Sequence, residues 1–172
     1  LTKSLPLAWS SYIAGEPVKS DDILEIRYPW DGSLTGTLSK ITPKQLEQAI
    51  QSALGNKLIP TKNERYEILM RARVLLAERA DEFANLIRLE AGLCMRETRY
   101  EVGRAQEVLK FAAAEALRDD ESIFSCDAAK NGPARKIFTL REPLSLIVAI
   151  TPFNHPLNQV AHKLAPAIAA GV

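Results

Sequence analysis

The sequence is poor in the residues that build cross-linked or metal-held domains. It contains two cysteines, Cys94 and Cys126, and two histidines in 172 residues. The cysteines lie far apart and lack the nearby Cys or His companions that zinc-site spacings require, so the sequence predicts neither a disulfide framework nor a metal site. We expect both thiols to be free and buried, and the protein to work in a reducing, cytoplasmic setting.

An excess of charge of one sign and long apolar runs are also lacking. The 22 basic and 21 acidic residues leave a formal net charge of +1. This balance provides no electrostatic footprint for nucleic acid or for an anionic membrane. No apolar run approaches the length of a membrane span, and the short N-terminal patch broken by Pro6 is too short for a secretory signal.

What the sequence does contain is the composition of a folded globular domain. Hydrophobic residues make up 47% and charged residues 25% of the chain, far from the profile of a disordered protein. The length suits one ordinary domain with a sizeable core. A small molecule or another protein is therefore the expected partner.

Strand and turn signals fill the first forty residues. Residues 12–14 and 24–28 have the alternating or β-branched character of strands, and polar turn residues follow each of them at 15–17 and 29–32. This pattern predicts a β-ribbon.

Helical periodicity replaces the strand pattern from residue 42 onward. Thr42 followed by Gln45, and Thr61 followed by Glu64, are typical capping boxes at helix starts. Gly92 provides a natural end for a third helix. The four predicted helices begin near residues 42 and 61 and span about 81–91 and 97–117. Apolar positions at helical spacing predict their buried faces, among them Leu46, Ile50, Ile68, Leu69, Leu75, Leu76 and Ile87.

Extended structure returns after residue 120. Residues 122–127 and 136–140 flank a polar turn at 130–133, which predicts a hairpin that is apolar on one face. The apolar run 144–150 predicts a strand buried on both faces, as in a parallel α/β sheet. A helix then begins at Pro156 and ends at Gly171, which gives half of a βαβ unit whose second strand is absent.

The segment REPLSLIVAITPFNHPL at 141–157, together with KLAPAIAAG at 163–171, resembles the aldehyde dehydrogenase family. In that family a buried strand leads into a Pro-aromatic-Asn-x-Pro loop, and a helix follows. The resemblance covers essentially the whole chain and implies an incomplete α/β fold with an N-terminal β-ribbon, a helical region and the start of a Rossmann-like parallel sheet. It implies three parts: the ribbon and helical part of the cofactor-binding domain (1–120), part of an oligomerisation ribbon (121–141), and the first strand, oxyanion loop and helix of the cofactor-binding core (142–172).

The resemblance also implies a reaction. Family members attack an aldehyde with a cysteine thiolate, and the resulting oxyanion needs a hydrogen-bond donor. Asn154 matches that donor, while Ile150, Thr151, Pro152 and Phe153 match the residues that line the groove for NAD or NADP. The alternative is that Asn154 only caps the helix that follows, which is a common role for asparagine.

A finer resemblance is to the branch of the family that acts on phosphonoacetaldehyde, carried by residues 123–127, 134–143 and 150–158. It implies that Arg104 and His155 bind the substrate, since a phosphonate needs charge-assisted donors. Another small or anionic aldehyde, such as lactaldehyde or a sugar-phosphate aldehyde, is the alternative substrate.

Each substrate-binding assignment has a structural alternative. Arg104 could form an ion pair on its own helix with one of its acidic neighbours, Glu97, Glu101 or Glu107. His155 could pack under the loop and bond a backbone carbonyl. His162 and the neighbouring Lys163 are expected to be structural.

Neither Cys94 nor Cys126 has the sequence context of the family nucleophile. The resemblance places that cysteine beyond residue 172, so we expect the chain to be inactive as an isolated dehydrogenase. A truncated, non-catalytic scaffold is the alternative to an enzyme. The complete protein is expected to form a homo-oligomer, either a dimer or a tetramer.

Overall fold

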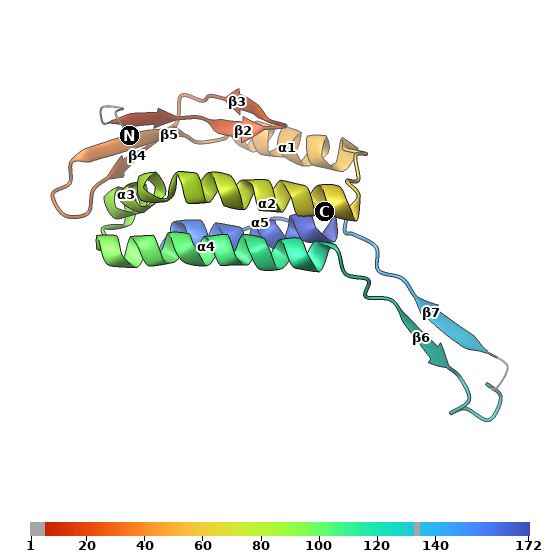
Figure 1. Cartoon of the computed structure of the whole chain (residues 1–172). Helices are drawn as coiled ribbons and strands as arrows, with labels where there is room; N and C mark the ends of the chain where they lie inside the picture. The colour runs from red at the N-terminus through yellow and green to blue at the C-terminus, as the bar shows by residue number, and fades with distance from the viewer. Residues whose placement is uncertain (1–5, 133–134) are drawn as a thin grey trace.

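The computed structural model describes residues 6–132 and 135–172. A layer of short strands lies on one side, the helices are stacked beneath it, and a two-stranded hairpin projects from one end (Figure 1). The strands are β1 (Leu7–Trp9), β2 (Ser11–Ile13), β3 (Glu16–Val18), β4 (Ile23–Arg27), β5 (Leu34–Ser39), β6 (Ser122–Ser125) and β7 (Lys136–Thr139). The helices are α1 (Pro43–Gly55), α2 (Lys62–Glu78), α3 (Ala80–Ala91), α4 (Met95–Ala116) and α5 (Pro156–Ala170).

The predicted N-terminal β-structure is confirmed, with more strands than the sequence pattern indicated. β2 and β3 form an antiparallel hairpin, and its turn residues Ala14 and Gly15 have φ angles of 51° and 84°. Two left-handed residues suit the twist of a tight hairpin. β5 pairs parallel with β1 and antiparallel with β4, although neither β1 nor β5 was evident as a strand from its residues.

All four predicted helices between residues 42 and 117 are confirmed. Thr42 and Thr61 each cap their helix with a complete capping box, formed with Gln45 and Glu64. Gly92 ends α3 in the left-handed conformation, with a φ of 70°, as a C-terminal glycine does.

The core lies where α4 packs against α2, α3 and α5. Leu69 of α2 and Val102 of α4 are its largest fully buried apolar side chains. Several positions that were expected to be buried are about half exposed instead, including Leu46, Ile68 and Leu75. Those predictions were wrong because one face of α1 and one face of α2 have no covering element in the part of the chain that the structure describes.

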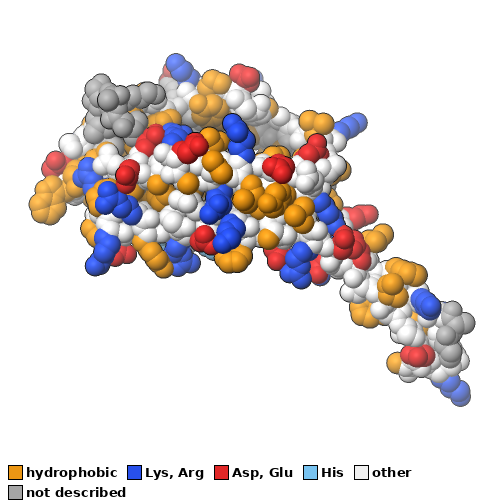
Figure 2. Space-filling view, in the orientation of Figure 1, with side chains coloured by type: hydrophobic (Ala, Val, Ile, Leu, Met, Phe, Trp, Pro, Cys, Tyr) orange, Lys and Arg blue, Asp and Glu red, His pale blue; other side chains and the backbone are white. Residues whose placement is uncertain are grey.

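The β6–β7 hairpin projects away from the helices, as the ribbon and the space-filling view both show (Figures 1 and 2). Its register pairs Ile123 with Phe138 and Phe124 with Ile137. Adjacent positions of a strand point to opposite faces, so each face carries an apolar pair. The expectation of one apolar face was therefore wrong. Pro133 of the predicted turn lies outside the described residues.

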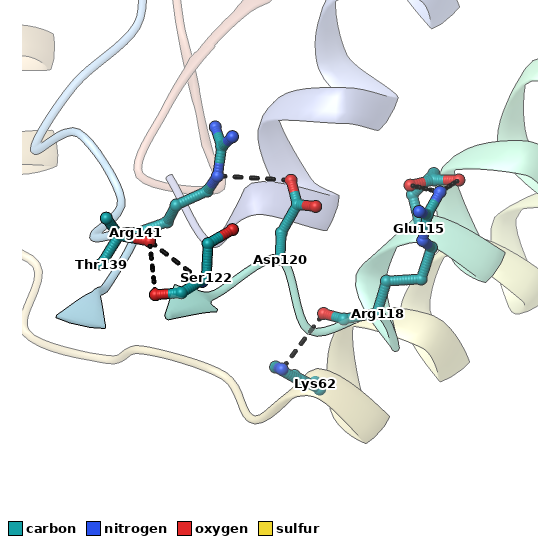
Figure 3. Close-up of polar contacts among 7 residues, drawn as sticks. All are labelled: Lys62, Glu115, Arg118, Asp120, Ser122, Thr139 and Arg141. Carbon is teal, nitrogen blue, oxygen red and sulfur yellow. Dashed lines mark hydrogen bonds and ion pairs between the residues drawn. The ribbon is translucent and has the colours of Figure 1, made fainter. Parts of the chain in front are cut away.

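Polar contacts close the hairpin where it leaves and rejoins the helices (Figure 3). The Arg141 guanidinium lies 3.3 Å from the Asp120 carboxylate. The backbone N–H of Ser122 donates to the Thr139 hydroxyl over 3.0 Å. The two segments that connect the hairpin to α4 and α5 are thereby held side by side.

The apolar run 144–150 differs from its prediction. It forms no strand, and all of it except the half-buried Leu146 is exposed. A strand of a parallel sheet needs partner strands, and no strand of the described chain lies beside this run. The prediction of a buried strand was wrong, because pairing and burial depend on neighbours that these residues do not include.

Candidate active site

The candidate site is built around the start of α5. Pro156 occupies the first helical position, where its missing N–H costs nothing. His155 is the N-cap residue, but its side chain makes no capping hydrogen bond. The backbone N–H groups of Leu157 and Asn158 donate instead to Oε1 of Glu101, over 2.9 and 3.0 Å. A carboxylate from α4 thus satisfies the donors that a local cap would normally bond.

Glu101 is a buried acid on the packed face of α4. Its side chain is 1% exposed, and it lies at helical spacing with the buried Thr98 and Ala105. Negative charge at a helix N-terminus is stabilised by the helix dipole and by the free N–H groups. Its second oxygen, Oε2, lies 3.4 Å from Nδ1 of His155 and has no hydrogen-bond partner among the described residues.

This arrangement bears directly on Asn154. Asn154 precedes the N-cap residue and is exposed. The alternative that Asn154 caps α5 is wrong, because Glu101 accepts the hydrogen bonds that a capping asparagine would accept. No hydrogen bond of the Asn154 amide occurs within residues 6–132 and 135–172, so its N–H groups remain available as donors.

The four residues before Asn154 present an open apolar surface. Ile150 is 82% and Phe153 is 89% exposed, and Thr151 and Pro152 are exposed as well. Exposed apolar side chains beside accessible main chain fit the flat face of a nicotinamide ring, which needs apolar contact and a few backbone partners. These residues are therefore compatible with the cofactor-lining assignment.

Arg104 lies in a groove between α4 and α5. The groove has a volume of about 590 Å³, and its lining includes Tyr100, Val108, Phe111 and His162. The Arg104 guanidinium lies over the Tyr100 ring, 6.0 Å from its centroid. No ion pair of Arg104 is found within the described chain, so its guanidinium N–H groups have no carboxylate partner there.

The three acidic neighbours of Arg104 are each engaged elsewhere. Glu97 pairs with Arg96 at 3.0 Å, and Glu107 pairs with Lys110 at 3.3 Å. Glu101 is bound to α5. The expected alternative, an ion pair of Arg104 on its own helix, is therefore not formed with any of these three described residues.

The structure brings Arg104 together with His162 in this groove, whereas His155 faces Glu101. His155 keeps a 48% exposed side chain, so its substrate-binding role stays a prediction. His162 was expected to be structural, but it is exposed on α5. No local signal indicated this position, because Arg104 and the other groove residues lie on α4, more than fifty residues earlier in the chain.

Glu101 was considered from the sequence only as an ion-pair partner for Arg104. Its helical spacing with the small residues Thr98 and Ala105 was the available sign that its carboxylate lies on the packed face of α4. Nothing local indicated its partners, since they lie more than fifty residues further along the chain.

The two cysteines lie away from this site. Cys94 is the N-cap residue of α4 and is exposed, so the expectation that it is buried was wrong. Cys126 follows β6 and is half-buried. Both are free thiols. Within the described residues there is no group of three or more His, Cys, Asp or Glu side chains arranged to hold a metal ion.

None of the helices in the described part of the chain combines the length and apolar character needed to span a membrane. Acidic and basic side chains are interspersed over the face seen in Figure 2. That face therefore offers no broad surface of a single charge.

The site has a buried carboxylate that fixes a helix start, an exposed asparagine just before it, and an apolar loop leading to both. In a comparison with known families, residues 17–172 match the aldehyde dehydrogenase family. The chain belongs to the aldehyde dehydrogenase family.

Two curated relatives show the extent of the match. The chain is 37% identical over 163 residues to a 3-sulfolactaldehyde dehydrogenase of Priestia aryabhattai, covering 93% of this chain and 34% of the relative. It is 32% identical over 164 residues to a lactaldehyde dehydrogenase of Methanocaldococcus jannaschii, with the same coverage of 93% and 34%.

A crystal structure of an NADP-dependent glyceraldehyde-3-phosphate dehydrogenase from Bacillus halodurans C-125, complexed with NADP, superposes with a TM-score of 0.90 at 30% identity. The superposition covers 96% of this chain and 36% of that one. The chain thus spans about a third of the length of the curated relatives it matches. The predicted α/β architecture of an N-terminal aldehyde dehydrogenase segment is confirmed.

Proposed function

We propose that this chain is part of an NAD(P)-dependent dehydrogenase that oxidises a small anionic aldehyde to the corresponding acid. The observation that carries the proposal is the exposed Asn154 amide, held next to a helix start whose N–H groups are already bonded to Glu101. Membership of the aldehyde dehydrogenase family supports the reaction class.

In the proposed reaction a cysteine thiolate adds to the aldehyde carbon, and the electron pair of the carbonyl bond moves to oxygen. We place this cysteine in a part of the protein beyond residue 172. The Asn154 amide donates a hydrogen bond to that oxygen as its charge develops. One such donor typically lowers the barrier by about 3 to 4 kcal/mol.

NAD(P)+ supplies the hydride acceptor when it is bound. The exposed residues from Ile150 to Phe153 would hold the nicotinamide beside the reacting carbon. The related structure that is complexed with NADP supports a nicotinamide cofactor. NAD and NADP carry the same nicotinamide ring, so both fit the apolar surface of these residues.

Arg104 and His162 support an anionic substrate. The guanidinium of Arg104 has no carboxylate partner in the described chain, and the groove that it lines is shared with a histidine. Arginine binds tetrahedral anions through several N–H groups in a planar fork. The substrate in the name of one relative, 3-sulfolactaldehyde, carries a sulfonate group. The phosphonate group of phosphonoacetaldehyde is a similar tetrahedral anion. Lactaldehyde is the uncharged alternative, with its own support among the relatives.

The test measures aldehyde-dependent formation of reduced cofactor by the full-length protein that carries this chain. We expect Arg104→Ala to raise KM for 3-sulfolactaldehyde and phosphonoacetaldehyde about 10- to 100-fold, as for loss of a charged hydrogen bond. KM for lactaldehyde should change less than about 3-fold.

Arg99→Ala is the matched control, because Arg99 is an exposed arginine of α4 that pairs with Asp81. Equal effects of Arg104→Ala on charged and uncharged aldehydes would contradict the anionic substrate. No aldehyde-dependent turnover with either cofactor would contradict the reaction class.

A further inference from the structure

We propose that Glu101 is the positioning residue for the Asn154 loop, and that it acts by gripping the start of α5 from the neighbouring helix. This inference rests on the proposed function for its catalytic consequence. Its structural part can be tested independently.

The grip, by which we mean the contacts of the Glu101 carboxylate with His155, Leu157 and Asn158, has two parts. Oε1 accepts hydrogen bonds from the N–H groups of Leu157 and Asn158, while Oε2 faces Nδ1 of His155 at 3.4 Å. One carboxylate therefore contacts three of the four residues that follow Asn154. Since Asn154 is joined directly to His155, the direction in which the loop enters α5 is set at Glu101.

Burial makes this grip rigid. The Glu101 side chain is 1% exposed, and α4 packs against α5 along its length. Burying a carboxylate is costly unless hydrogen bonds compensate for the lost water, and the N–H groups of Leu157 and Asn158 are the donors to Glu101 here, so the site favours the arrangement in which α5 starts at this point. Residues 150–154, by contrast, are exposed and form no regular structure. Of the segment on both sides of Asn154, only the following side is anchored to the core.

A hydrogen-bond donor to an oxyanion must be held within a fraction of an ångström of its working position. The local sequence provides no capping side chain for α5, because neither Asn154 nor His155 bonds its N–H groups. Glu101 replaces that local cap with a contact from α4, the same helix that carries Arg104. The helix that lines the groove thus also sets the position of the oxyanion donor.

The structural test uses the 172-residue chain. We expect Glu101→Ala to reduce the hydrogen-exchange protection of the Leu157 and Asn158 amides about 10-fold or more, as for loss of hydrogen bonds to a charged acceptor. Glu101→Gln keeps one acceptor oxygen and should reduce protection less. Glu97→Gln, an exposed carboxylate one turn earlier on α4, is the control and should leave both amides unchanged.

Unchanged protection of both amides in Glu101→Ala and Glu101→Gln would overturn the grip. If Glu101→Ala does not fold, the Glu101→Gln comparison alone decides the matter, because Gln is nearly isosteric with Glu.

The catalytic test uses the full-length protein and a double-mutant cycle. We expect Glu101→Gln to lower kcat by up to about 100-fold, the scale of a small misplacement of a catalytic group, with KM for the aldehyde nearly unchanged. In an Asn154→Ala background the same substitution should have little further effect on kcat, because the group that it positions has been removed. A merely structural role would lower kcat equally in both backgrounds, and that result would overturn the positioning role.

The two hypotheses fail in different ways. A full-length protein that oxidises no aldehyde would contradict the proposed function, while the amide protection would still report on the grip. An active protein whose Glu101 variants retain full kcat would contradict the positioning role alone.

Discussion

At the scale of single residues, the capping of α5 and the proposed donation of a hydrogen bond to a ligand belong to two different side chains. Glu101 satisfies the N–H groups of α5, and this leaves the Asn154 amide without a structural duty. Helix N-caps in proteins are usually served by the residue just before the helix. Because a side chain of another helix takes this role here, neither His155 nor Asn154 caps α5, and the Asn154 amide is free to bind a ligand.

The left-handed turn at Gly92 allows a sharp test of the backbone at this scale. Gly92 ends α3 with a φ of 70°, and a Cβ there would lie 3.2 Å from two carbons of Pro29. Gly92→Ala should therefore lower the free energy of unfolding by about 1 to 2 kcal/mol, the cost of a left-handed non-glycine residue. Thermal or urea unfolding of the 172-residue chain measures this change.

Gly55 provides the control for that measurement. It ends α1 without a positive φ, and a Cβ at this position would have no neighbouring atom within 4 Å. Gly55→Ala should be neutral or slightly stabilising, by about 0.5 to 1 kcal/mol at most. Similar losses of stability in both variants would contradict the role of the left-handed turn at Gly92.

At the scale of elements, the helix starts that the sequence predicted are those with local signals. Thr42 and Thr61 lie three residues before their capping partners, so the relevant contacts are visible in a short stretch of sequence. The start of α5 was predicted from Pro156, but its true cap was not, because Glu101 approaches it from α4. The prediction that residues 144–150 form a buried strand failed for a similar reason, since a strand in a parallel sheet depends on strands that are distant in sequence.

The capping box of α2 also predicts a pH dependence. The backbone N–H of Thr61 and, to a lesser extent, its hydroxyl donate to the Glu64 carboxylate, and these bonds lower the pKa of Glu64 below its ordinary value of 4.5. A carboxyl whose pKa is lower in the folded state stabilises that state above its unfolded pKa and loses this contribution as the pH falls through the folded pKa.

Urea midpoints measured from about pH 6 down to about pH 3 test this dependence. The midpoint of the parent chain should fall more steeply with acid than that of Glu64→Gln, which keeps an acceptor oxygen but does not titrate. Parallel pH profiles for the two chains would show that Glu64 contributes no pH-dependent stability.

At the scale of the whole molecule, the described chain has more exposed apolar surface than its helical core would suggest. The two faces of the β6–β7 hairpin, the 144–150 run and one side of α2 are all uncovered. Exposed apolar surface of this kind is typical of contacts with another chain or with further parts of the same protein. We propose that a homo-oligomer covers the hairpin, as the resemblance to the family predicted.

Self-association through the hairpin can be tested at β7. Phe138 is 68% exposed on this strand, and Phe138→Lys should reduce the apparent mass of the 172-residue chain in sedimentation experiments at micromolar concentration. The physical reason is that a charged edge or face opposes pairing of exposed strands.

Leu58→Lys is the matched control, because Leu58 is 82% exposed in the connection between α1 and α2. It adds the same charge to the body of the molecule and should leave the mass unchanged. An equal effect of both substitutions, or a parent chain that is already monomeric, would contradict association through the hairpin.

The closed base of the hairpin has a consequence for how the molecule can vary. Asp120 and Arg141 hold its two ends together, so the chain leaves α4 and comes back toward α5 at nearly one place. The path of the chain through residues 142–156 therefore starts beside Asp120, whatever the length of the hairpin between the two ends. The hairpin can therefore lengthen, shorten or change its partner, at a loop-closure cost of only about 0.6 kcal/mol for each doubling of its length. The distance between Glu101 and the start of α5 would not change with it, so the proposed association through the hairpin and the proposed positioning of Asn154 are free to evolve separately.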